Sequence, residues 1–198
     1  MIIINLIFKI ILFVDKFFEY IFNISILRHI STFYQKNSIR YVKFKNNKIK
    51  FFCPTKETKI RVNSFFSKEP ETIKWINKFK NKQIVFWDIG SNIGIFSIYA
   101  ALKHKNIQVV SFEGALSNLR ILSRNIFIND LNNKIGICQI PVTNNYIGFQ
   151  YFHESQFVEG TALNYFIKKN KNKDLYNYKI LGTSLDSIYF NQKLKIPN

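Results

Sequence analysis

The sequence predicts an α/β fold built on an open parallel sheet, and three observations support that prediction. An apolar strand at Ile84–Phe86 leads into a glycine turn and then into a helical pattern. A second apolar run, Val109–Phe112, ends in an acid, and a third, Ile135–Ile140, ends before a proline. Strands that alternate with helices in this way form parallel sheets covered by their connecting helices.

Length and composition are those of one globular domain with an appendage. The chain has 198 residues, 47% of them hydrophobic and 17% aromatic, with seven glycines and four prolines. Its formal net charge of +17 is typical of nucleic-acid binders. Only five of the 29 basic residues are arginines, however, and the abundant lysine, asparagine, isoleucine and phenylalanine share A/T-rich codons. We therefore do not expect nucleic acid as a specific partner, although weak association with anionic lipid or RNA stays open.

Residues 1–24 predict an amphipathic helix, because apolar residues recur three or four positions apart. On a helical wheel the polar residues fall within an arc of about 120°. Lys9 and Asp15 interrupt the apolar run, which is too short for a span of about 20 apolar residues. No basic lead or small-residue cleavage site of a signal peptide accompanies it. Two interpretations stay open: a helix that docks on a protein domain, or an anchor on a membrane surface.

The next segments predict short elements that lead to the parallel sheet. The helical pattern continues through residues 25–35. Residues 39–45 and 48–53 alternate around Asn46 and Asn47, which predicts a hairpin whose asparagines take positive φ. Ser67 is the expected cap of a helix over residues 70–79.

We place a domain boundary at residue 80. Residues 1–80 then form an amino-terminal part, with the amphipathic helix, the hairpin and the lead-in helix. Residues 81–198 form the domain that contains the predicted parallel sheet.

The turn between the first strand and its helix carries the functional signal. Asp88 ends the strand, where open α/β sheets bind ligands and where a carboxylate can bind an ammonium group. Gly90 and Gly94 have no Cβ and let the backbone turn sharply beside a ligand. Glu113 follows the second strand, about twenty residues on, where an acid commonly accepts hydrogen bonds from ribose hydroxyls.

Glycine spacing distinguishes between cofactors. Dinucleotide folds use Gly-x-Gly-x-x-Gly, whereas this turn runs Gly90-Ser91-Asn92-Ile93-Gly94 and has no middle glycine. The Gly-Lys-Ser/Thr end of a phosphate-binding loop is also missing. With the acid at residue 113, the pattern predicts S-adenosylmethionine. The alternative is a turn whose glycines serve only packing.

The remaining segments predict further elements of the same domain. A helix is expected over residues 116–129, a strand over 147–152, a loop or short helix facing substrate from Glu159, and a capped helix from Thr183 or Ser184. Residues just after a third strand often pack against adenine, so Val142 and Thr143 are candidates. Three histidines and two distant cysteines match no metal-ligand spacing, and we expect no metal.

Over residues 60 to 198 the chain resembles FkbM-type methyltransferases. The residues that carry the resemblance are Trp87–Gly94, Phe112–Glu113, Asn118, Asn125, Asn129 and Thr183–Ile188, with Lys68–Thr72 and Trp75–Ile76 upstream.

The resemblance implies a class I methyltransferase fold, Rossmann-like, and methyl transfer from S-adenosylmethionine to a glycan or small-molecule hydroxyl. We expect the protein to lie in the cytoplasm, at the inner membrane face if the first helix is an anchor. By position, the resemblance implies that Asp88, Gly90, Asn92 and Gly94 line the donor and that Glu113 holds its ribose. Ser91, within the turn, and Val142, after the third strand, complete the set of candidate cofactor-binding residues.

Two departures from the family stand out. Gly114 occupies the position where the family usually has a proline, which we expect to alter the loop rather than abolish binding. The family's next strand lies beside the first one, and this chain stops before it would begin. We therefore expect residues 84–87 to form an unpaired sheet edge. Either the reading frame is truncated or a second chain completes the sheet.

The catalytic base is unknown, and His153 and Glu154 are the only local options. Two other functions stay open beside O-methylation. One is an RNA methyltransferase. The other is a non-catalytic fragment that binds a membrane surface or a partner.

Overall fold

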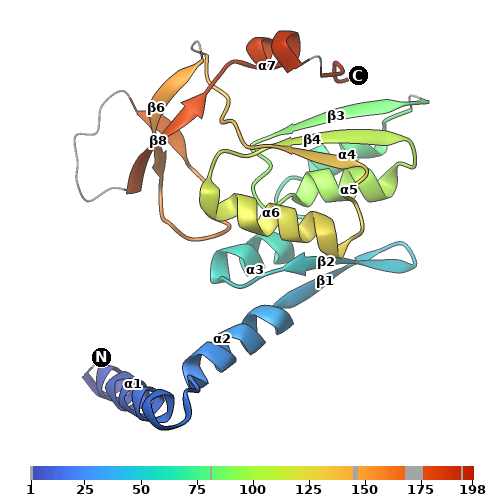
Figure 1. Cartoon of the computed structure of the whole chain (residues 1–198). Helices are drawn as coiled ribbons and strands as arrows, with labels where there is room; N and C mark the ends of the chain where they lie inside the picture. The colour runs from blue at the N-terminus through green and yellow to red at the C-terminus, as the bar shows by residue number, and fades with distance from the viewer. Residues whose placement is uncertain (1, 81, 145–146, 168–175, 193) are drawn as a thin grey trace. The chain divides into compact units, whose positions relative to one another are not determined.

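The structure is a computed structural model that describes residues 2–80, 82–144, 147–167, 176–192 and 194–198. The chain divides into two compact units, Met1–Ile39 (unit 1) and Arg40–Asn198 (unit 2) (Figure 1). The sequence placed a boundary at residue 80. The structure instead joins residues 40–80 to the sheet domain, because the hairpin that they contain packs on a helix of that domain.

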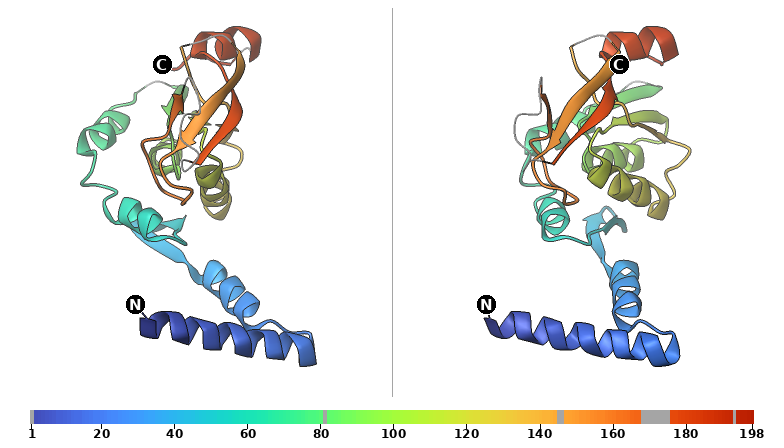
Figure 2. Two further views of the ribbon diagram at one scale, coloured as in Figure 1. Left: turned by 90° about the vertical axis from the view of Figure 1, so that its left-hand side faces the viewer. Right: turned by 60° about the vertical axis from the view of Figure 1, so that its left-hand side comes forward.

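Unit 1 consists of two helices, α1 (Ile2–Phe22) and α2 (Ile26–Asn37). The helix predicted over residues 1–24 is confirmed, and the pattern after residue 25 forms a second helix. Asn23 takes a positive φ of 54°, which ends α1. The Ser25 Oγ accepts a hydrogen bond from the Arg28 amide at 3.1 Å and so caps α2. Figure 2 shows the bend between the two helices.

The predicted parallel sheet is confirmed. Its strands are β3 (Ile84–Ile89), β4 (Ile107–Phe112) and β5 (Ile135–Cys138), hydrogen-bonded in that order and all parallel. The crossover helices α5 (Ile95–Lys103) and α6 (Leu116–Ile128) lie on one side of the sheet (Figure 1). This open α/β arrangement with parallel strands is the Rossmann-like fold that the sequence predicted.

The edge of β3 is only partly unpaired, which corrects the expectation. The backbone amide of Asn198 donates to the Val85 carbonyl at 3.1 Å, and the Val85 amide donates to the Asn198 Oδ1 at 3.1 Å. The side-chain amide of Asn198 also donates to the Gln83 carbonyl. The outward-facing main chain of β3 is therefore paired at residue 85.

The predicted hairpin is confirmed as β1 (Ile39–Phe44) and β2 (Asn47–Phe52), but its turn differs. Lys45 takes the positive φ, at 51°, rather than either asparagine. A two-residue hairpin turn needs this conformation at its first central position, and here the strand pairing puts a lysine there.

Two helices precede the parallel sheet. The helix α3 (Lys56–Asn63) was not predicted from the sequence. It begins with a capping box between Thr55 and Thr58. The expected helix after residue 69 is α4 (Pro70–Asn77), but its cap is Glu69, without a side-chain hydrogen bond. Ser67 is not the cap, because its amide and hydroxyl donate back to the Ser64 carbonyl.

A second, antiparallel sheet follows, with the strand order β7-β6-β8. The strand expected over residues 147–152 is β6 (Gly148–Glu154), and its neighbours β7 (Tyr165–Ile167) and β8 (Tyr176–Gly182) were not predicted. The last helix, α7 (Leu185–Gln192), begins as expected after Ser184, whose Oγ accepts from the Ser187 amide at 3.1 Å.

Two asparagines on α6 and the one that caps its C-terminus, which we call the asparagine row (Asn118, Asn125 and Asn129), tie distant segments together. Asn125 is fully buried; its Oδ1 accepts from the Phe52 amide at 2.7 Å and its Nδ2 donates to the Ile93 carbonyl at 2.9 Å. Asn129 pairs in the same way with the amide and the carbonyl of Lys50. These side chains thus occupy the place that a neighbouring strand would take beside β2.

We expect Asn125→Ala to lower the free energy of unfolding by about 3 kcal/mol, because two buried backbone groups, the Phe52 amide and the Ile93 carbonyl, lose the hydrogen bond that this side chain makes to each. Asn129→Ala is the matched control. It makes equivalent contacts with the same strand near water, so its cost should be about 1 kcal/mol or less. Urea unfolding of both variants measures the difference. Equal losses would contradict this account of the row.

Candidate active site

The glycine turn is held by the strand beside it. The amides of Gly90 and Ser91 both donate to the Phe112 carbonyl, at 2.8 and 2.9 Å. Gly90 has a φ of +77°, and a Cβ built there would meet no atom within 4 Å, so the space beside it is open. Such a position lets a ligand approach the backbone closely.

Gly94 lets the backbone turn sharply, as predicted, and it also allows two helices to pack closely. Its φ is +85°, and a Cβ there would lie 2.5 Å from the Leu122 Cδ1. The glycine lets α6 pack closely against the start of α5, and it lines neither of the two cavities at the turn. Gly94 therefore has a packing role in the described structure, and its contact with a donor stays a prediction.

Two cavities, each of about 270 Å³, meet at the turn. Ile89, Gly90 and Asn92 line both of them. The first cavity extends toward α3 and α4, and Arg61, Glu69, Trp75 and Asp88 are among its lining residues. The second extends toward the end of β5 and is lined by Glu113, Val142, Phe152 and Asn164, among others. The arrangement suits an elongated ligand that bends over the Gly90 turn.

Asp88 lines the first cavity although it is largely buried, with only 8% of its surface exposed. Its Oδ2 accepts from the amide and the hydroxyl of Ser97, at 2.9 and 2.5 Å, and the Ser97 hydroxyl also contacts the Ser111 hydroxyl at 2.7 Å. Within the described part of the chain its Oδ1 has no hydrogen-bond partner. Burial raises the pKa of Asp88, against the opposing effect of the Ser97 hydrogen bonds.

Glu113 lines the second cavity at the end of β4. Its Oε2 accepts from the Asn92 amide at 2.7 Å, and its Oε1 accepts from the Ala115 amide at 2.8 Å. Burial raises the pKa of Glu113, while hydrogen bonds from Ala115, Asn92 and the Asn118 side chain act in the opposite direction. A carboxylate can accept about four hydrogen bonds, so Glu113 retains capacity for a hydroxyl donor.

The other predicted residues lie at the turn or at the second cavity. The Asn92 side chain donates to the Thr161 carbonyl at 2.6 Å, so it holds a loop as well as lining both cavities. Ser91 lines the first cavity and its hydroxyl donates to the Phe112 carbonyl. Val142 lines the second cavity and pairs with Thr183, whereas Thr143 lines neither of the two.

Gly114 lies where the structure leaves no room for a side chain. A Cβ at this position would lie 2.6 Å from the Cβ of Pro141. The proline that follows β5 therefore occupies the space that a side chain at residue 114 would need.

Arg61 is a cavity residue that the sequence analysis missed, because it lies on the unpredicted helix α3. Its Nε donates to the Gly160 carbonyl. Among the described residues, its terminal nitrogens have no hydrogen bond and no ion pair. Burial lowers the pKa of Arg61, while Glu113 and Glu69 act to raise it. A half-buried guanidinium with free donors is suited to binding an anion.

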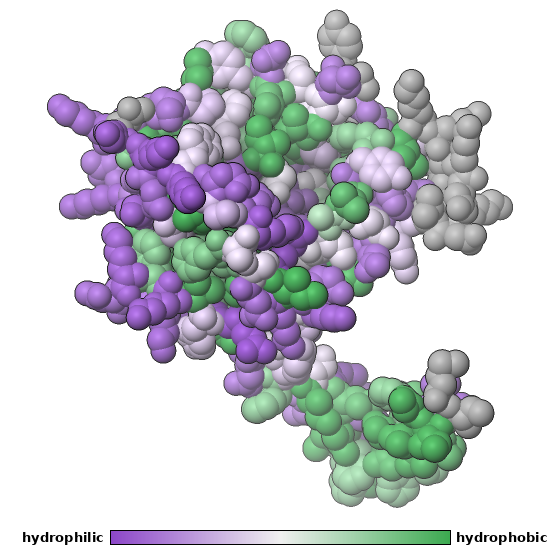
Figure 3. Space-filling model, turned by 180° about the vertical axis from the view of Figure 1, so that it is seen from behind, coloured by the Kyte–Doolittle hydropathy of each residue, from purple (hydrophilic) through white to green (hydrophobic). Residues whose placement is uncertain are grey.

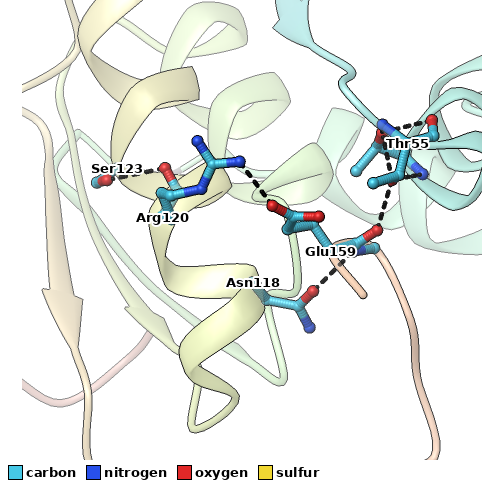
Figure 4. A network of polar contacts seen from close by, with 7 residues as sticks. Thr55, Asn118, Arg120, Ser123 and Glu159 are labelled. Carbon is cyan, nitrogen blue, oxygen red and sulfur yellow. Dashed lines mark hydrogen bonds and ion pairs between the residues drawn. The ribbon is translucent and has the colours of Figure 1, made fainter. Parts of the chain in front are cut away.

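A loop after β6 closes over the junction of these elements (Figure 4). Thr55 and Arg120 bind Glu159, at 2.7 Å through its carbonyl and 2.6 Å through its carboxylate. The Asn118 Oδ1 accepts from the Gly160 amide at 2.8 Å. The loop expected from residue 159 thus contacts the site, and Ala162, Leu163 and Asn164 line the second cavity.

Neither of the two local options for a base, His153 and Glu154, lines either of these two cavities. Glu154 is fully buried and accepts from the Leu116 amide, the Ser117 hydroxyl and the Tyr178 hydroxyl. Burial, followed by the hydrogen bond to Glu154, raises the pKa of Tyr178. The His153 Nδ1 lies 3.0 Å from the Asn177 Oδ1, on the antiparallel sheet. These two residues hold structure.

No protein-family model and no curated protein matches the chain. Solved structures do resemble it. P. horikoshii TYW2 in complex with MeSAdo is 16% identical, covers 53% of this chain and 37% of its own, and has a TM-score of 0.35. A SAM-dependent methyltransferase from Agrobacterium tumefaciens is 10% identical, with 52% and 32% covered and a TM-score of 0.36. StiE O-MT is 12% identical, with 48% and 34% covered and a TM-score of 0.36.

The chain spans about a third of the length of these three structures. The fold assignment rests on the sheet topology of this chain itself.

We expect Gly160→Ala to release the loop after β6, which contains Gly160, from its contacts with α3. Gly160 has a φ of +88°, and a Cβ there would lie 2.7 Å from the Thr58 amide nitrogen and 3.0 Å from the Glu57 carbonyl carbon. Hydrogen exchange of the Gly160 amide should become about tenfold faster or more. Gly136→Ala, where the nearest atom is 4.0 Å away, is the control. Unchanged protection in the first variant would argue against a fixed loop.

Proposed function

We propose that this chain binds S-adenosylmethionine in the two joined cavities and is related to the FkbM-type methyltransferases. The observation that carries the proposal is the open Gly90 turn, with a carboxylate beside it in each cavity. The chemistry is methyl transfer to an oxygen acceptor, a glycan or small metabolite, which the family resemblance favours. An RNA acceptor and a non-catalytic fragment are the competing outcomes of the tests below.

The nucleoside end of the donor fits the second cavity. Glu113 has free acceptor capacity at the end of β4, which suits two ribose hydroxyls. Val142 and Phe152 supply apolar surface for an adenine ring.

The amino-acid end fits the first cavity, whose lining carries charges of both signs. Arg61 has free guanidinium donors for a carboxylate, and the Asp88 Oδ1 is an acceptor for an ammonium group. The carboxylate and the ammonium group of the donor's amino-acid end would therefore each meet a side chain of opposite charge.

When bound, the donor supplies an activated methyl group on a sulfonium. An acceptor oxygen bonds to the methyl carbon while the carbon–sulfur bond breaks and its electron pair stays on sulfur. The acceptor proton passes to water or to a base. The residues of this chain would bind and orient the reactants, which is the main contribution an enzyme makes to such a displacement.

Glu113→Ala should weaken binding of S-adenosylhomocysteine about tenfold or more, because the ribose hydroxyls lose their acceptor. Glu71→Ala, an exposed carboxylate on α4, should leave binding unchanged. Isothermal calorimetry measures both, with circular dichroism to check folding. If the parent chain binds no donor, the non-catalytic fragment is favoured. If S-adenosylhomocysteine binding becomes much tighter with structured RNA present, an RNA acceptor is favoured.

Arg61→Met should weaken S-adenosylhomocysteine about tenfold and leave 5′-methylthioadenosine unaffected, because only the first ligand carries the amino-acid carboxylate. Lys68→Met removes an exposed cation from the lining of the same cavity and is the matched control. A variant that loses both ligands equally would indicate a structural role for Arg61.

A further inference from the structure

We infer that unit 1 binds the surface of a membrane that contains anionic lipid, with the apolar faces of α1 and α2 buried at the interface. This inference is independent of the proposed methyl transfer and concerns where the chain binds, not what it catalyses.

The first observation is the amount of apolar surface that unit 1 exposes. Every described side chain of α1 is exposed except Asp15, which is half-buried, and α2 has no buried residue. Figure 3 shows apolar side chains gathered over this part of the chain, at the lower right. The large apolar side chains concerned are Ile3, Ile4, Leu6, Ile7, Phe8, Ile10, Ile11, Leu12, Phe13, Val14, Phe17, Phe18, Tyr20, Ile21, Phe22, Ile24, Ile30, Phe33 and Tyr34. Soluble monomers rarely expose so large a contiguous apolar surface.

The second observation is that both acids of unit 1 are used at the bend between the helices. Asp15 accepts from the Ser25 hydroxyl, at 3.2 Å to one of its oxygens, and from the Leu27 amide at 2.9 Å. Glu19 forms an ion pair with Arg28 at 3.1 Å. Polar contacts between the two helices therefore hold the bend.

The charges left over are positive. Lys9, Lys16 and Lys36 have no ion pair among the described residues, and residues 1–39 carry four basic and two acidic side chains, a difference of +2. The whole chain carries +17. Lysines attract a chain to anionic lipid, and their apolar stems allow the charged ends to reach water from a helix that lies in the interface.

A surface orientation fits α1 better than insertion across the bilayer. Among the described residues, no helix is long and apolar enough to cross a membrane. The charged residues of α1 lie within an arc of about 120° of its circumference, as in helices that lie parallel to the membrane plane.

Lipid also suits unit 1 better than a second copy of the chain. The apolar arc of α1 covers about two-thirds of its circumference, whereas a helix-to-helix seam covers a stripe of roughly 100°. A dimer seam would therefore leave much of this surface in water. A lipid interface covers the whole arc and brings negative charge to the unpaired lysines.

The test is flotation of the full chain with vesicles of phosphatidylcholine, with and without phosphatidylglycerol. Ile10 lies opposite the polar arc and Asn5 lies within it. Ile10→Glu should lower the partition coefficient about tenfold or more, because a charge enters the buried face. Asn5→Glu adds the same charge to the polar arc and should cost much less. Binding should be stronger with phosphatidylglycerol and should weaken with added salt.

Circular dichroism checks that both variants remain folded, and calorimetry with S-adenosylhomocysteine reports the donor site separately. Failure of the parent chain to float, or equal flotation of the two variants, would overturn the inference. So would a dimer in sedimentation experiments without lipid that Ile10→Glu converts to a monomer. A lost donor site with intact flotation would count only against the proposed methyl transfer.

Discussion

The fold of unit 2 depends on one constraint: the polar groups between α6 and its neighbours must find partners away from water. Asn125 is fully buried between β2 and the turn that precedes α5, and its amide supplies one donor and one acceptor there. An apolar side chain of similar size would leave the Phe52 amide and the Ile93 carbonyl without partners. Because Ile93 belongs to the glycine turn, this single side chain connects the hairpin to the candidate site.

The other two asparagines of the row also pair with backbone groups of distant segments. Asn129 binds Lys50 at one end, and Asn118 binds Gly160 at the other. The row therefore fixes three segments that are distant in sequence against one helix. The Gly90 turn, Glu113 and the loop after β6 are all held by hydrogen bonds within the chain, and groups held in this way need less ordering when a ligand binds.

Sequence reasoning predicted the parts governed by local patterns. Apolar runs at residues 84 and 109 gave the parallel strands, and the acid at 113 lies beside the turn as expected. It failed where the role of a residue depends on a distant neighbour. Gly94, at the start of α5, packs against Leu122 of α6. Arg61 lines the first cavity on α3, and its side chain binds the Gly160 loop. No sequence motif of fixed spacing predicts either contact.

Gly114 and Pro141 lie in contact at the ends of two adjacent strands. A side chain at residue 114 would require a residue smaller than proline at position 141, so the two sites should covary during evolution. Swapping only one member of the pair between relatives would then be harmful, while exchanging both together would be tolerated.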